Sequence, residues 1–173
     1  WNPMNVAGNE LDYSRVREPL SSAFFTFDAE GTPTFNKNFL TAEPKVENNP
    51  NTKVTYSLNP KAVWGDGTAI SVKDFQATWK ACDGSNEKFE CATTEGYDQI
   101  ASIEQGATAQ DIVVTFKSTY PDWVAVFAGG PARAESVADE TVFNTGWSTL
   151  GGHEGWISGP YKLGSYDTTA KII

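Results

Sequence analysis

The sequence has few of the side chains on which most catalytic and metal sites depend. Its 173 residues include one histidine, His153, and two cysteines, Cys82 and Cys91. A zinc site needs about four ligands with close local spacing, so these residues predict no metal site. Neither a phosphate-binding glycine-rich loop nor a Gly-x-Ser-x-Gly nucleophile elbow occurs, and we expect no cofactor. His153 stands in a glycine-rich loop that holds a catalytic base poorly, so we interpret it as an exposed loop residue and expect no enzyme.

Positive charge and long apolar runs are also scarce. Thirteen Lys and Arg residues stand against 22 Asp and Glu, which gives a net charge of −9 at pH 7. A chain with this charge repels phosphate backbones and anionic lipid, so we expect no nucleic-acid partner. No segment approaches the roughly 18 apolar residues of a membrane-spanning helix, and residues 1–4 lack the features of a signal peptide. The 39% hydrophobic and 13% aromatic content does predict a buried core.

The residue patterns predict a mixed chain of strands and short helices. Residues 53–58 alternate strictly between polar and apolar side chains, which is typical of a half-buried strand. Ser71, with Asp74 three residues later, predicts the start of a helix that ends near Gly84. We expect further strands at 23–27, 99–104 and 112–116, short helices within 1–20, 121–127 and 135–145, an extended connection at 32–52, and a hairpin over 161–173.

Two interpretations of the cysteine pair are open. Cys82 and Cys91 lie nine positions apart, and the rest of the chain suggests an exported protein, which favours a disulfide. A bond closing such a loop would stabilise the fold by roughly 2.5–3 kcal/mol in the chain-entropy model. The alternative is a pair of buried thiols.

The tryptophans divide into two groups. Trp64, Trp79 and Trp123 accompany apolar patterns and are expected in the core. Trp147 and Trp156 lie among Gly, Ser and Thr, where no packed face is evident, so each is as readily expected at a ligand cleft or interface as in a packed position. These two leave a carbohydrate-binding module open as an alternative function. An extracellular hydrolase with a carboxylate pair is a further alternative, although nothing marks which two of the 22 acidic residues would form the pair.

Four segments in order carry a family resemblance. Residues 64–75 read Trp-Gly-Asp-Gly-Thr-Ala-Ile-Ser-Val-Lys-Asp-Phe, residues 1–4 read Trp-Asn-Pro-Met, residues 97–116 contain Tyr-Asp-Gln-Ile and Asp-Ile-Val-Val-Thr-Phe, and residues 158–163 read Ser-Gly-Pro-Tyr-Lys-Leu. Together they resemble the family 5 extracellular solute-binding proteins, the oligopeptide- and dipeptide-binding components of ABC importers. Gly65 replaces the usual serine of this family motif, and Ser71-Val72 replaces Thr-Ala; both changes preserve the turn and the helix cap.

The resemblance implies a periplasmic-binding-protein-like mixed α/β fold of the two-lobed type, with mixed sheets and short helices. Residues 1–32 and 156–173 would form part of lobe I, and residues 33–155 the inserted domain II. The C-terminal lobe that closes on the ligand would be absent. The last residues also predict an unfinished strand, so we expect the chain to be part of a longer protein.

The implied function is an extracytoplasmic substrate-binding component of an ABC transporter, secreted, lipid-anchored or periplasmic. It would bind peptides or a similar small solute as a monomer and deliver them to a membrane permease. Besides Trp147 and Trp156, the residues that match the family's ligand-facing loop are Asn5, Val6, Ala7, Gly8 and Asn9, whose backbone would pair with an extended ligand. Some relatives act instead in cell-envelope biosynthesis, and a regulatory protein of that kind is an alternative.

Overall fold

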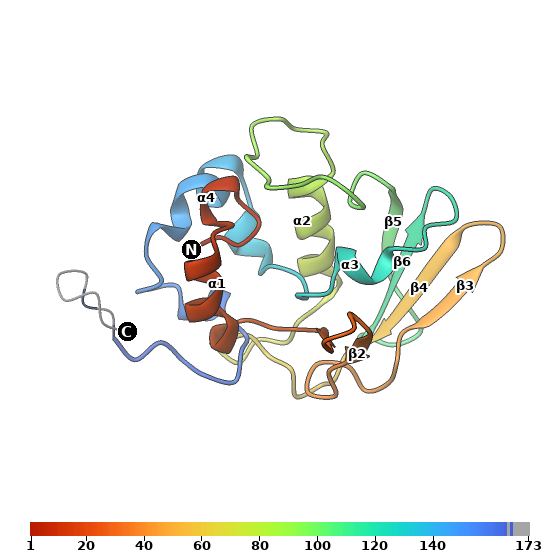
Figure 1. Ribbon diagram of the computed structural model, residues 1–173, viewed down its shortest axis with the longest axis horizontal. Helices are drawn as coiled ribbons and strands as arrows, with labels where there is room; N and C mark the ends of the chain where they lie inside the picture. Colours follow the sequence, from red (N-terminus) through yellow and green to blue (C-terminus); the bar gives the residue numbers. More distant parts are fainter. Residues whose placement is uncertain (166, 168–173) are drawn as a thin grey trace.

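The computed structural model describes residues 1–165 and 167. The helices are α1 (Leu11–Arg17), α2 (Val72–Cys82), α3 (Trp123–Val126) and α4 (Glu140–Thr145), and the strands are β1 (Phe25–Phe27), β2 (Pro33–Phe35), β3 (Lys45–Asn48), β4 (Thr52–Ser57), β5 (Ile100–Gln105) and β6 (Asp111–Phe116). Strands β3, β4, β6 and β5 form an antiparallel sheet in that order, and β1 pairs with β2 in a separate ribbon. Figure 1 shows the sheet at one end of the molecule, α1 and α4 at the other, and α2 between them.

The main core lies between the sheet and α2. Val54 and Tyr56 of β4 are buried while the residues between them are not, as the alternation predicts. Phe75 of α2 is fully buried, and its ring centre lies 4.8 Å from that of Phe127. Burying one such side chain stabilises a fold by roughly 1.5–3 kcal/mol. Gln76 also donates a hydrogen bond of 2.8 Å to the Ile103 carbonyl of β5, which fixes the helix on the sheet.

Local signals set both ends of α2. The Asp74 carboxylate accepts a hydrogen bond of 2.8 Å from the Ser71 backbone N–H, and the predicted capping box is present. The chain leaves the helix through Gly84, whose φ of +79° favours glycine. A disulfide joins Cys82, the last residue of α2, to Cys91, so the interpretation as buried thiols is wrong.

Three sequence expectations need correction. The connection at 32–52 contains β2 and β3, whose side chains are mostly exposed and therefore lack the apolar alternation that identifies a strand. The helix expected over 135–145 is divided, because Asp139 caps a new helix by accepting a hydrogen bond from the Val142 N–H. Residues 161–165 of the expected last hairpin form no strand, and residues 166 and 168–173 lie outside the described part. Within the described residues, no helix is long and apolar enough to cross a membrane.

Candidate functional site

The first and last parts of the described chain meet at the helical end of the molecule. Leu20 packs with Trp147, Leu150 and Ile157 in a small apolar cluster. The Leu20 carbonyl accepts backbone hydrogen bonds from Ser158 (3.2 Å) and Gly159 (3.0 Å). This cluster and these bonds fix the Gly- and Trp-rich segment 146–160, although its sequence predicts little regular structure.

The turn before α2 approaches the same segment closely. The Gly65 N–H donates a hydrogen bond of 2.7 Å to the Ile157 carbonyl. A Cβ atom on Gly65 would lie 2.0 Å from the carbonyl oxygen of Glu154, a distance that no side chain tolerates. The glycine that replaces the family's usual serine therefore lets the turn and residues 154–157 touch.

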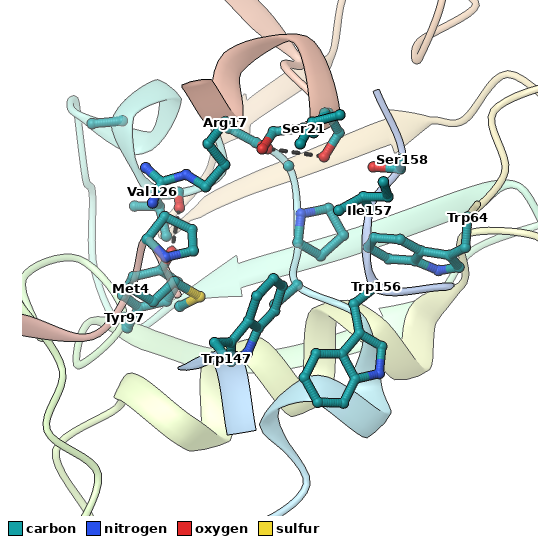
Figure 2. Close-up of a pocket in the computed structure, with 18 residues that line it drawn as sticks. Met4, Arg17, Ser21, Trp64, Tyr97, Val126, Trp147, Trp156, Ile157 and Ser158 are labelled. Carbon is teal, nitrogen blue, oxygen red and sulfur yellow. Dashed lines mark hydrogen bonds between the residues drawn. The ribbon is translucent and has the colours of Figure 1, made fainter. Parts of the chain in front are cut away.

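A pocket of about 220 Å³ opens between these segments, and we call it the aromatic pocket. Figure 2 shows Trp64, Trp147 and Trp156 around one side of it. Met4, Arg17, Tyr97 and Val126 line it as well, together with Pro3, Leu20, Ser21, Ser22, Ala125, Gly129, Gly130, Pro131, Ala132, Ile157 and Ser158. Most of these side chains are apolar, so the pocket suits an apolar group of a ligand.

Hydrogen bonds at the indole nitrogens hold two of the tryptophans. Trp64 donates to the Asp74 carboxylate over 3.3 Å, and Trp147 donates to the Ser136 carbonyl over 3.1 Å. The ring centres of Trp147 and Trp156 lie 5.0 Å apart. His153 is half-buried and stacks on Trp156 at 3.8 Å, so its interpretation as an exposed loop residue is wrong. With the indole nitrogens of Trp64 and Trp147 bonded elsewhere, these two rings offer apolar surface to the pocket.

An ion pair supports the Trp64 side of the pocket. Arg133 donates to the Asp66 carboxylate over 3.0 Å and to the Gly155 carbonyl over 3.4 Å, and its guanidinium lies 5.9 Å from the Trp64 ring centre. The Thr68 backbone N–H, and after it Arg133, lower the pKa of Asp66 from 3.8 to about 2. Arg133 therefore joins the turn before α2 to the segment that carries Trp156.

The predicted loop residues lie mainly in a second space, the N-terminal cleft. Asn5, Ala7 and Gly8 line this cleft of about 420 Å³ with Trp147, whereas Val6 and Asn9 are exposed and do not line it. The Asn5 side chain accepts a hydrogen bond from the Ala7 N–H. The N–H groups of Val6 and Gly8 are bonded to the carbonyls of Glu90 and Asn5. Backbone donors of this loop are thus already used within the chain.

Trp147 lines both the aromatic pocket and the N-terminal cleft, whereas Trp156 lines only the aromatic pocket. The sequence patterns do not mark Arg17, Met4 or Tyr97 as pocket residues. A charged residue in a short helix is usually solvated, and a Met or Tyr near apolar neighbours usually belongs to a core, so no local signal identifies these three.

Comparisons with known proteins agree with the resemblance. Residues 38–173 match the model of the bacterial extracellular solute-binding proteins, family 5 Middle. The chain is 31% identical over its whole length to the oligopeptide-binding protein OppA of Mycobacterium tuberculosis, and it spans 29% of that protein. Over 73% of the chain it is also 31% identical to the probable monoacyl phosphatidylinositol tetramannoside-binding protein LpqW of the same species, and it spans 19% of that protein.

The fold is similar to that of a solved periplasmic EDTA-binding protein, EppA. The TM-score is 0.84 at 23% identity, and the match covers 96% of this chain and 32% of the other. The chain therefore spans less than a third of the length of these relatives. Its mixed α/β fold is that of periplasmic-binding-protein-like proteins, and the chain belongs to the bacterial extracellular solute-binding proteins, family 5.

Proposed function

We propose that this chain is part of the substrate-binding component of an ABC importer and forms one wall of a cleft for a peptide or similar small solute. The observation that carries the proposal is the 31% identity to an oligopeptide-binding protein across the entire chain. The aromatic pocket supports it, because three indole rings, two of them fixed by hydrogen bonds, provide an apolar surface that loses little entropy on binding. The proposed role is non-catalytic and extracytoplasmic, and a membrane permease would receive the solute.

We also propose that residues 1–32 and 156–173 belong to one lobe and residues 33–155 to an inserted domain. The bonds from Ser158 and Gly159 to the Leu20 carbonyl support this division, because they join the two distant segments of the first lobe. On this division, the bond from Gly65 to Ile157 would join the first lobe to the inserted domain. The aromatic pocket draws its residues from both, as expected of a cleft between lobes. A further C-terminal lobe would close over it.

Isothermal titration calorimetry of the full-length protein with a pool of short peptides tests the function. We expect saturable binding by the full-length protein and much weaker binding by residues 1–173 alone, because one wall of a cleft excludes little water. Trp156→Ala should weaken binding by the full-length protein, whereas Phe27→Ala, at an exposed aromatic residue that does not line the pocket, serves as the matched control. Absence of binding to any peptide in the pool would contradict the proposal. Retention on polysaccharide that depends on Trp147 and Trp156 would favour a carbohydrate-binding module instead.

A further inference from the structure

Arg17 is the only charged residue among those that line the aromatic pocket in the described part of the chain. The protein as a whole has a net charge of −9, so a pocket whose one charged lining residue is a cation differs from the average surface of the protein. Figure 2 shows the Arg17 side chain extended along the edge of the pocket, across from Trp147 and Trp156. The pocket therefore combines an apolar wall with one positive group.

The guanidinium is fixed by backbone contacts and not by a carboxylate. Its Nη1 donates to the carbonyls of Trp1 (3.3 Å) and Gly8 (3.2 Å). A guanidinium carries five N–H donors in a planar fork, and these two bonds occupy only the Nη1 end. Among the described residues, no hydrogen bond or ion pair engages Nε or Nη2 of Arg17. The edge that binds a carboxylate with two parallel hydrogen bonds is thus left without a protein partner.

Arg17 differs from the other two arginines in being half-buried without a carboxylate partner among the described residues. Arg133 also lies beside Trp64, but it is paired with the carboxylates of Asp66 and Glu135. Arg15, in the same helix as Arg17, is exposed to solvent. Arg17 is half-buried, and burial lowers the pKa of its guanidinium. A half-buried cation without a counter-ion is unfavourable, and an anion that reached it would offset that cost.

We propose that Arg17 is the anion subsite of the aromatic pocket and binds a carboxylate of the ligand. An apolar group next to that carboxylate would rest against Trp147 and Trp156. This inference rests on the proposed function and narrows it: the solutes are peptides or small molecules with a free carboxylate beside an apolar group. Arginine suits the role because its planar fork matches a carboxylate in two-bond geometry.

Calorimetry of the full-length protein with two matched pools of short peptides tests the subsite. One pool has free carboxyl termini and the other is amidated at the same position, so the pools differ by one negative charge. We expect the wild-type protein to bind the free-acid pool about tenfold more tightly, which is the usual effect of a charge-assisted hydrogen bond. Arg17→Gln should reduce this ratio to about one, by weakening binding of the free-acid pool more than binding of the amidated pool. Arg17→Lys should give an intermediate ratio, because it retains the charge without the fork.

Arg15→Gln is the matched control, since it removes the same charge from the same helix away from the pocket, and it should keep the wild-type ratio. If Arg17→Gln weakens binding of both pools equally, Arg17 only supports the Gly8 loop and the subsite is wrong. An unchanged ratio in Arg17→Gln contradicts the subsite as well, while the proposed function stands. If neither pool binds the wild-type protein, the proposed function itself fails, and the subsite fails with it.

Discussion

The sheet core and the aromatic pocket are built in opposite ways. In the core, β5 and β6 form one hairpin, and α2 lies on β5 through residues such as Phe75 and Gln76. In the pocket, the side chains come from segments as distant as Met4 and Ser158, and single backbone bonds hold them together. We therefore expect the core to supply most of the stability. The pocket depends on a few close contacts, which can open locally while the core remains folded.

The largest effect is expected in the core. Phe75→Ala removes a fully buried ring that contacts Phe24, Tyr56 and Phe127, so it should lower the free energy of unfolding by about 3–5 kcal/mol. Urea denaturation followed by far-ultraviolet circular dichroism measures the loss. Lys73→Ala, on the exposed side of the same helix, should stay within about 0.5 kcal/mol of wild type. A small loss for Phe75→Ala would show that the core is not the main source of stability.

An intermediate effect is expected where the turn meets the pocket segment. Gly65→Ala places a methyl group against the Glu154 carbonyl, which must move and carry Trp156 with it. We expect a loss of about 1–3 kcal/mol in the free energy of unfolding, together with a loss of peptide affinity. Gly151→Ala is the control, because its Cβ would meet only the Thr149 hydroxyl at 3.5 Å. Wild-type affinity in Gly65→Ala would mean that the close approach is unimportant for the pocket.

The smallest effect is expected from pH, because Asp66 is exposed. Its pKa is lowered to about 2 in the folded chain by the Thr68 backbone N–H and then by Arg133, so the ionised Asp66 carboxylate contributes stability above the ordinary value of 3.8. That contribution is lost as the pH falls from 3.8 through about 2. This contribution can be isolated by measuring the free energy of unfolding of wild type and Asp66→Asn across this range. The difference in unfolding free energy between the two proteins should shrink as the pH falls. A difference that stays constant with pH would exclude the ionised Asp66 carboxylate as its source.

The same contrast explains how much the sequence could predict. The start of α2 at Ser71, its end near Gly84 and the hairpin of β5 and β6 depend on residues close together in the chain, and these predictions are confirmed. Strand β3 was missed because it is an exposed edge strand whose pairing with β4 leaves no apolar pattern of its own. The disulfide was favoured from spacing and the inferred export, and the structure contains it.

The pocket could be predicted only in part. Trp147 and Trp156 were candidates because they lie on glycine-rich segments, and both line the aromatic pocket. Arg17 could not be found, because its role depends on segments far from it in the sequence. The role of residues 5–9 in ligand binding stays a prediction. So does the division into lobes, because the chain spans only 29% of its OppA relative.

The contact at the Leu20 carbonyl determines how easily the first and last segments of the described chain can separate. Ser158 and Gly159 both bond to this one oxygen, and Tyr161 bonds to the neighbouring Pro19 carbonyl; among the described residues no strand ladder reinforces the contact. Separation of the two segments is then a local opening that leaves the sheet intact, with a free energy below that of global unfolding. The amide protons of Ser158 and Gly159 should exchange with solvent faster than those of β6, and a ligand that seals the pocket should slow them. Their exchange rates would measure directly how often these two segments separate at the proposed cleft.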